Sequence, residues 1–526
     1  MFAHAHSYLT VTNLTVFLND RKLIADLQFK INSGAKVAII GEEGNGKSTL
    51  LKIIADESLP ENIKYQGEIT KNYHQFGYLP QTIPAIFQHL TTLQFLLYNP
   101  KTKEFDWDLL NDFTQINSIF AKFHLPSSWL EQPVRFDQLS GGEQIKLSLA
   151  RILLSSPEII FLDEPTNNLD LATIKWLENF IRTTALPILY VSHDIELLKN
   201  TATHILHLEQ TKNKQQARST FGKSSYSEYI ANRAHKLDWE ETESNRQKRK
   251  RSQTIRKLLD VKNKVQTNQE NILDSSARRL LNKRMKTVIS QQKKLDKQEL
   301  LSAPDVEEAI KIDFSHSSRP PKHKKIIHLN FDQLIIDDKT ILQKTNLEIN
   351  GPAKICFTGP NGCGKSTLLK QIYHDLLSDQ IKVGYLPQNH LDFFSIPEYR
   401  AIDYVRYYNS KLDESAARSL LGQLKFTPRE MLELPTQLSG GQMTKLILLC
   451  LSLGNFSILI LDEPTRNLSP LSLPIIISAL QKFPGCLLCA SHDREFIDQV
   501  FRDVYQFDDR KLICLDAQNI IQKIDL

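Results

Sequence analysis

A glycine-rich pattern that occurs twice constrains this 526-residue chain more than any other feature. The pattern G-x-x-x-x-G-K-[ST] begins at Gly41 and again at Gly359. Each copy follows a short apolar run, 37–40 or 355–357, and precedes a stretch with helical character. A loop of this kind between a strand and a helix lets backbone N–H groups surround an anionic phosphate. We therefore expect two α/β nucleotide-binding domains in one chain.

The two loops supply side chains as well as backbone groups. We expect Lys47 and Lys365 to reach the β and γ phosphates, and Ser48 and Ser366 to give hydroxyl ligands to Mg²⁺. The residues predicted to surround the phosphates are Gly41, Glu42, Glu43, Gly44, Asn45, Gly46, Lys47, Ser48 and Thr49 in the first loop, and Gly359, Pro360, Asn361, Gly362, Cys363, Gly364, Lys365, Ser366 and Thr367 in the second.

Further motifs follow both loops in the same order. Gly-Tyr-Leu-Pro-Gln ends at Gln81 and at Gln388, and Leu-Ser-Gly-Gly begins at Leu139 and Leu438. An apolar run then ends in Asp-Glu-Pro, and Ser-His-Asp comes last. One such match alone is weak, but a repeated ordered set is specific.

This ordered set resembles the ATP-binding cassette superfamily over residues 8–211 and 326–517. The resemblance implies an α/β fold with two P-loop ATP-binding cassette domains joined by a long α-helical hairpin linker. We expect the first cassette at 1–211, the basic linker at 212–325 and the second cassette at 326–526.

The resemblance also implies that the two cassettes pair head to tail within a monomer and share two ATP molecules. One ATP would lie between the first loop and Ser439, Gly440, Gly441 and Gln442; the other would lie between the second loop and Ser140, Gly141 and Gly142. Glu164 and Glu463 are the candidate general bases, and His193 and His492 would position the water and the γ-phosphate. The predicted Mg²⁺ residues are Ser48, Gln81, Asp163, Ser366, Gln388 and Asp462.

Two departures from the family pattern predict unequal sites. Phe17 is placed to stack on adenine, whereas Ile335 at the matching position has no aromatic face. After the Asp-Glu pairs, the first cassette has Asn168-Leu169-Asp170, but the second has Asn467-Leu468-Ser469-Pro470 and lacks the acid.

The charge of the chain is concentrated in the segment between the cassettes. Residues 212–325 hold 28 Lys and Arg against 14 Asp and Glu, although the whole chain has a net charge of only +5. Such density favours a polyanion such as nucleic acid, with Arg246, Lys248, Arg249, Lys250 and Arg251 as candidate contacts. The alternative is a solvated helical face, but few Glu residues are present to balance it in i,i+4 pairs.

This segment is expected to form two helices. Proline is absent from 188–303 and glycine from 223–350, and Ser225-Tyr-Ser-Glu228 is typical of a helix start. We expect a first helix of about 40 residues at ~1.5 Å each. The turn should fall at 268–276, where Ile272 and Leu273 are candidates either for contact with the nucleic-acid partner or for packing between the helices.

Other features restrict the class of protein. No apolar run of 18 residues is present, the N-terminus does not resemble a secretion signal, and all six cysteines lie between 356 and 514. We expect a cytoplasmic protein with reduced, buried thiols and no membrane contact. The cysteines do not fit the superfamily's iron-sulphur recycling factor or the zinc sites of excision-repair ATPases.

Two cassettes joined by a basic hairpin resemble the ABC-F family of ribosome-associated ATPases. Membership implies ATP and Mg²⁺ as cofactors and the 70S ribosome as partner, with action at the tRNA exit site. The linker would then reach 23S rRNA, peptidyl-tRNA and the peptidyl-transferase centre. The linker and the stretch 467–472 resemble antibiotic-resistance members that protect the ribosome. The alternatives are a drug-independent translation factor and the tandem ATPase of a membrane exporter, although no dedicated permease is expected.

Overall fold

The computed structural model describes residues 7–19, 21–99, 102–107, 113–132, 134–167, 169–211, 214, 216–271, 283, 290, 312–321, 325–336, 339–378 and 381–516. The chain divides into two compact units. One comprises Met1–Tyr226 with Glu308–Leu526 and contains both cassettes; the other is Ser227–Glu307. The loops, sheets and helices predicted for both cassettes therefore belong to one unit.

A mostly parallel six-stranded sheet forms the centre of the first cassette. Its order is β11-β10-β3-β9-β8-β5, and only β11 runs antiparallel to its neighbour. Apolar residues fill β3, β8 and β9, which are buried along their whole length because both faces of a parallel sheet are covered. The strands are β3 (Lys36–Ile40), β5 (Phe76–Leu79), β8 (Ile159–Asp163), β9 (Ile188–Val191), β10 (His204–Thr211) and β11 (Gln216–Lys223).

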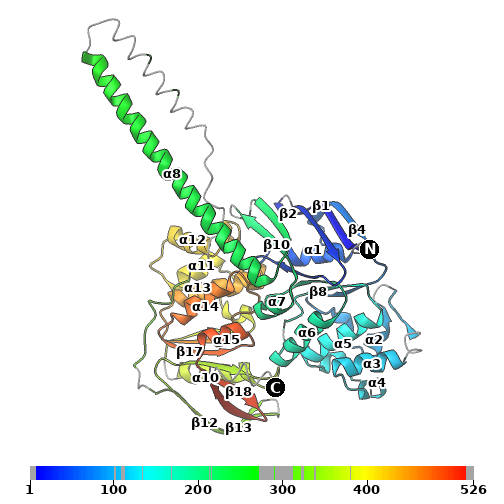
Figure 1. Ribbon diagram of the computed structural model, residues 1–526. Helices are drawn as coiled ribbons and strands as arrows, with labels where there is room; N and C mark the ends of the chain where they lie inside the picture. Colours follow the sequence, from blue (N-terminus) through cyan, green and yellow to red (C-terminus); the bar gives the residue numbers. More distant parts are fainter. Residues whose placement is uncertain are drawn as a thin grey trace. The chain divides into compact units, whose positions relative to one another are not determined.

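A second sheet and a helical region complete this cassette. The antiparallel sheet has the order β2-β1-β4 and packs into the same core as β3 and α1. In Figure 1 this sheet and helices α2 to α5 lie at opposite ends of the cassette. The elements are β1 (Ser7–Leu18), β2 (Arg21–Asn32), β4 (Ile63–Lys71), α1 (Lys47–Ile54), α2 (Thr92–Leu97), α3 (Phe113–Phe123), α4 (Ser128–Glu131), α5 (Gly141–Leu154), α6 (Leu171–Thr183) and α7 (Ile195–Thr201), with a short pair β6 (Tyr98–Asn99) and β7 (Glu104–Phe105).

The second cassette repeats this arrangement. Its sheet has the order β15-β16-β17-β14-β18-β19, with the phosphate-loop strand β14 again beside the strand that precedes the Ser-His-Asp motif. The strands are β12 (Lys325–Ile336), β13 (Lys339–Asn350), β14 (Lys354–Thr358), β15 (Val383–Leu386), β16 (Ile458–Asp462), β17 (Cys486–Ala490), β18 (Asp503–Asp508) and β19 (Lys511–Asp516). The helices are α10 (Lys365–Ser378), α11 (Ala401–Tyr408), α12 (Glu414–Gln423), α13 (Gly440–Leu453), α14 (Leu473–Gln481) and α15 (Arg494–Val500).

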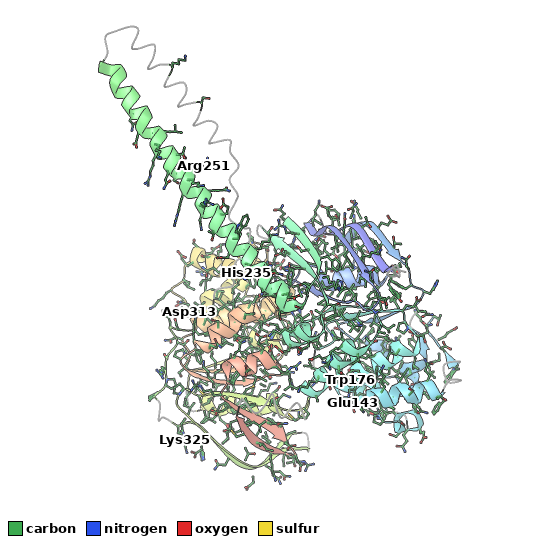
Figure 2. The ribbon with its side chains drawn as sticks, viewed as in Figure 1. Glu143, Trp176, His235, Arg251, Asp313 and Lys325 are labelled. Atoms are coloured by element: carbon green, nitrogen blue, oxygen red, sulfur yellow. The ribbon has the colours of Figure 1, made fainter. Side chains whose placement is uncertain are left out.

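Within the predicted linker, 212–325, the structure describes β11, residues 312–321 and one long helix, α8 (Tyr226–Asn271), of 46 residues. It begins directly after Ser225, where the sequence predicts a helix start, and would be about 70 Å long at the α-helical rise. Figure 2 shows His235 and Arg251 on this helix. The apolar residues of this helix are unevenly buried: Ile255 and Leu258 are half-buried, whereas Leu259 is 42% exposed.

The structure agrees with the predicted fold class and differs from the sequence predictions in details of the linker and the cysteines. The α/β fold with two P-loop cassettes is confirmed. The helix extends through 268–271, so a turn at 268–276 could begin only after Asn271, and Ile272 and Leu273 lie outside the described residues. Four of the six cysteines are buried, Cys363 is half-buried and Cys514 is exposed. Within the described ranges, no helix is both long and apolar enough to span a bilayer.

Candidate functional site

Each phosphate loop connects a buried strand to a helix, as the motif requires. Gly41 and Gly359 have φ of +149° and +146°, in the region that favours glycine. A Cβ at Gly41 would lie 2.3 Å from the Leu208 carbonyl oxygen, and one at Gly364 would lie 2.0 Å from Cγ2 of Ile341. The glycines therefore let the loops pass close to neighbouring elements.

The two loop lysines adopt the same geometry. Lys47 Nζ donates to the carbonyl oxygens of Gly41 at 2.8 Å and Glu42 at 3.0 Å. Lys365 Nζ donates to those of Gly359 and Pro360, both at 2.9 Å. Each ammonium group is thus held by its own loop, at the position from which it could reach a bound phosphate.

A serine and an aspartate meet beside each loop. Ser48 Oγ donates to Asp163 Oδ1 at 2.8 Å, whereas the buried Asp163 Oδ2 has no hydrogen-bond partner among the described residues. In the second cassette, neither carboxylate oxygen of the buried Asp462 has a hydrogen-bond partner in the described part of the chain. Burial raises the pKa of both aspartates, that of Asp163 to about 6. Unpaired, buried carboxylate oxygens next to a serine hydroxyl fit a site for a divalent cation.

Glu164, directly after β8, accepts hydrogen bonds from three side chains. The donors are Gln81 Nε2 at 3.0 Å, Asn167 Nδ2 at 2.8 Å and His193 Nε2, which lies 2.7 Å from Glu164 Oε1. Burial alone would raise the pKa of this carboxyl, but His193 and Asn167 lower it to about 2. Glu164 is therefore ionised at neutral pH.

Glu463 occupies the matching position after β16 but has a different environment. His492 Nε2 lies 3.7 Å from Glu463 Oε1, too far for a hydrogen bond, and Arg466 replaces the amide donor Asn167. Burial raises the pKa of Glu463 to about 8, and burial together with Lys365 lowers the pKa of His492 to about 3. At neutral pH both groups are mostly uncharged.

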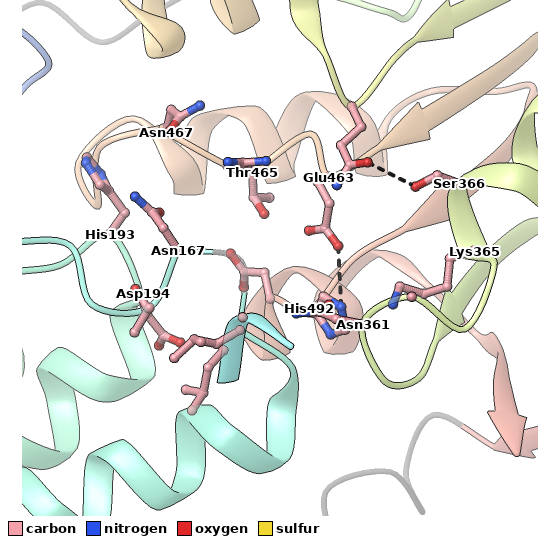
Figure 3. A pocket seen from close by; sticks show the side chains of 18 of the residues that line it. Asn167, His193, Asp194, Asn361, Lys365, Ser366, Glu463, Thr465, Asn467 and His492 are labelled. Atoms are coloured by element: carbon pink, nitrogen blue, oxygen red, sulfur yellow. Dashed lines mark hydrogen bonds and ion pairs between the residues drawn. The ribbon is translucent and has the colours of Figure 1, made fainter. Parts of the chain in front are cut away.

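Two cavities lie between the cassettes, each formed by residues from both. The first, of about 230 Å³, is lined by Lys47, Ser48, Gln81, Glu164 and His193 on one side and by Ser439, Gly440 and Gly441 on the other. The second, of about 680 Å³, is lined by Lys365, Ser366, Gln388, Glu463 and His492, and by Gly141, Asn167 and Asp194 of the first cassette. Figure 3 shows Asn167, His193 and Asp194 facing Glu463, Lys365 and His492 in the second cavity.

The Ser-Gly-Gly segments begin helices that point toward these cavities. Ser140 caps α5 and accepts from the backbone N–H of Glu143, and Ser439 caps α13 in the same way with Gln442. The glycines at the first turn allow close approach: a Cβ at Gly142 would lie 2.6 Å from Thr173 Oγ1. Two helix N-termini, each with a positive dipole end, therefore face the opposite cassette's site.

Several predicted site residues have side chains that lie elsewhere. Asn45 donates to the Leu208 carbonyl oxygen at 2.9 Å, and Gln442 caps its own helix. Cys363 and Pro360 line a separate small cavity beside Phe507. Phe17 lines another with residues 63–66. Ile335 is 55% exposed.

Glu42 and Glu43 also depart from the prediction, because their carboxylates contact the second cassette. Both pair with Lys445, and Glu42 also accepts from Lys425 Nζ and Ser472 Oγ. Lys445 was not predicted from the sequence, nor were Asn167 and Arg466, which lie three residues after the two candidate bases. Only for Asn167 and Arg466 does the sequence hold a clue, namely this matched spacing.

Comparison with known proteins agrees with this architecture. A family model described as "ABC transporter" matches residues 24–167 and 342–466, which together make up just over half of the chain. The ATP-binding protein Uup of Buchnera aphidicola is 28% identical over 95% of this chain and 80% of its own length. ABC transporter F family member 5 of Arabidopsis thaliana is 27% identical over 93% of this chain and 73% of its own length.

Solved structures share the tandem arrangement. A structure titled "Model of ribosome-bound archaeal Pelota and ABCE1" covers 97% of this chain and 80% of the matched chain, with a TM-score of 0.55 and 16% identity. At this identity the likeness concerns the fold alone. Paired cassettes, two phosphate loops and the matched residues lead to one conclusion: the chain belongs to the ABC transporter family, with two ATP-hydrolysing cassettes in tandem.

Proposed function

We propose that this protein is a ribosome-binding ABC-F ATPase that acts at the tRNA exit site, with its linker directed toward the peptidyl-transferase centre. The observation that carries the proposal is the basic helix α8, placed in sequence between two paired cassettes. The relative named as an F family member and the fold shared with a ribosome-bound protein support it.

In the first site, the proposed reaction is hydrolysis of ATP to ADP and phosphate. Lys47 and the N-terminus of α13 would hold the phosphates from opposite cassettes. The ionised Glu164 would take a proton from the attacking water, and His193 would orient both groups. Mg²⁺ would be held by Ser48 and Asp163, with Gln81 beside them, and would neutralise charge on the phosphates.

The second site holds the same groups in a less organised arrangement. Ser366 Oγ donates to Gln388 Oε1 at a long 3.4 Å, and Asp462 has two unpaired oxygens for a cation. Glu463 would need to lose its proton before acting as a base. We therefore propose that the second site hydrolyses ATP only after nucleotide and Mg²⁺ have reorganised it.

The linker's charge is available for nucleic acid. Arg246, Arg249 and Lys250 are exposed on α8, and among the described residues the ion pair of Arg246 is a long 3.4 Å contact with Glu243. Exposed basic groups of this kind suit phosphate binding. We propose that this part of α8 contacts 23S rRNA or peptidyl-tRNA.

Antibiotic resistance by ribosome protection is the finer form of the proposal. The long linker and the stretch 467–472 support it through the resemblance already described. A drug-independent translation factor is the alternative, and the two differ in whether a drug is needed to see an effect.

Replacement of both candidate bases, Glu164→Gln with Glu463→Gln, should preserve ATP binding and abolish hydrolysis. The ATP-bound, closed cassettes should then persist, and the protein should co-sediment with ribosomes in ATP but not in ADP. Phosphate release and ribosome pelleting measure these effects. Hydrolysis at the wild-type rate would disprove the base assignment, and co-purification with a membrane permease would favour the exporter alternative.

Neutralisation of Arg246, Lys248, Arg249, Lys250 and Arg251 to Gln should flatten the salt dependence of ribosome binding. The negative slope of the logarithm of the ribosome-binding constant against the logarithm of salt concentration should become smaller in magnitude by roughly 0.7 to 0.9 for each lost phosphate contact. ATPase activity without ribosomes should be retained. Replacing the exposed Lys411 and Lys482 of the second cassette is the control. An unchanged slope in the five-residue variant would indicate a merely solvated helix.

Alanine at Ile272, Leu273 and Asp274 should leave ATP hydrolysis, thermal stability and ribosome binding nearly unchanged but remove the protein's effect. The effect is measured as minimum inhibitory concentrations for macrolides, lincosamides, streptogramins and pleuromutilins, with and without expression. Growth effects without a drug would instead support a translation factor. Joint loss of stability and ribosome binding would assign these residues to helix packing.

The two sites should differ in pH dependence. In the Glu463→Gln variant only the first site keeps its base, Glu164, whose pKa is about 2. Hydrolysis by this variant should be nearly constant from pH 6 to 9. In the Glu164→Gln variant only the second site keeps its base, Glu463, and hydrolysis should increase as pH rises through about 8 because this base must be deprotonated. Phosphate release across this range is the measurement, and superimposable profiles would contradict the assignment.

A further inference from the structure

The two phosphate loops differ at the residues that face the opposite cassette. Glu42 and Glu43 of the first loop correspond to Pro360 and Asn361 of the second. The backbone turns alike at both, since the N–H of Asn45 donates to the Glu42 carbonyl and that of Cys363 to the Pro360 carbonyl. The two extra carboxylates are therefore not needed to shape the loop.

These carboxylates form a buried connection to the second cassette, here named the acid bridge: Glu42 and Glu43 with Lys445, Ser469 and Ser472. Lys445 Nζ lies 2.9 Å from Glu42 Oε2 and also bonds Glu43 Oε2. Ser472 Oγ lies 2.9 Å from both Glu42 oxygens, and the Ser469 N–H donates to Glu43 Oε1. The Glu42 side chain is 6% exposed and that of Lys445 is 3% exposed.

The acid bridge reaches the position at which the second cassette lacks an acid. Asp170 of the first cassette corresponds to Ser469 of the second, and its charge acts on His492 in the second site. At the first interface the carboxylate comes from the loop instead, because Glu43 binds the Ser469 backbone. Each interface therefore has a carboxylate of the first cassette near a loop that follows an Asp-Glu pair. This carboxylate is Glu43 at the first interface and Asp170 at the second.

The contacts lie beside the first cavity and bind the helix that faces it. Glu43 lines the first cavity, and a Cβ at Gly441 would lie 2.5 Å from Glu43 Cγ. Lys445 is on α13, the helix whose N-terminus faces the first loop. The Glu43 carboxylate therefore lies close to this helix start and joins the loop to the helix through Lys445. The first cavity is also the smaller, at about 230 Å³ against about 680 Å³.

We propose that the acid bridge keeps the first interface closed with or without nucleotide, so that the first site retains its nucleotide while the second opens and exchanges. The part of this inference that concerns nucleotide retention rests on the proposed ATPase function. The part that concerns closure of the first interface does not, because it involves the protein alone.

Hydrogen–deuterium exchange of the full chain without nucleotide tests the closure. The variant Glu42→Pro with Glu43→Asn gives the first loop the corresponding residues of the second loop. Peptides that cover Gly440–Leu453 should exchange at least tenfold faster in this variant than in the wild-type protein. Glu414→Gln, which removes an exposed partner of Arg418, is the control and should leave these peptides unchanged.

Moving the acid back to the second cassette supplies a rescue. Glu43→Asn alone and Ser469→Asp alone should each increase exchange, the first by losing the carboxylate and the second by placing two acids together. The double variant should restore the slow exchange, which a purely structural role of Glu43 would not produce. A double variant no slower than the singles would overturn the compensation between Glu43 and Ser469.

Nucleotide release gives the second readout. A fluorescent ATP analogue should leave the wild-type protein in a slow and a fast phase, and the Glu42→Pro/Glu43→Asn variant in the fast phase only. Failure to bind the analogue at all would reject the ATPase proposal but not the exchange result. Unchanged hydrogen–deuterium exchange over Gly440–Leu453 would overturn the proposed role of the acid bridge. If the Glu42→Pro/Glu43→Asn variant does not fold, the same measurement on Glu43→Gln decides the question.

Discussion

The buried ion pair between Glu42 and Lys445 is the contact on which the pairing of the cassettes most depends. Both charges are almost fully removed from water, so either one alone would be strongly unfavourable. Their pairing fixes which surface of the second cassette lies against the first phosphate loop. Arg494 with Glu178 adds a further pair between the cassettes, and Lys214, just after the first cassette, pairs with Glu430 of the second.

This arrangement places two chemically different sites at one interface. In the first, three donors hold Glu164 in its ionised form, and the cavity is small. In the second, Arg466 stands where Asn167 would be, and Glu463 holds its proton near neutral pH. The same fold and the same motif therefore give one preorganised site and one that must rearrange.

Much of this structure could be predicted from the sequence, because spacing alone fixes the order of strand, loop and helix. The two cassettes and the helix starting near Ser225 were predicted correctly. The direction of Glu42 and Glu43 could not be, because the variable positions of the loop motif carry no spacing rule and their partner Lys445 is distant in sequence. The difference in pKa between Glu164 and Glu463 could not be predicted from the sequence either, because a pKa depends on burial and on neighbours that folding brings together.

The central claim is that each nucleotide lies between the loop of one cassette and the Ser-Gly-Gly helix of the other. The most direct measurement is an experimental structure of the Glu164→Gln/Glu463→Gln protein with ATP and Mg²⁺. The account predicts two nucleotides, one with its γ-phosphate between Lys47 and Ser439, the other with its γ-phosphate between Lys365 and Ser140. Nucleotides that contact one cassette only would contradict it.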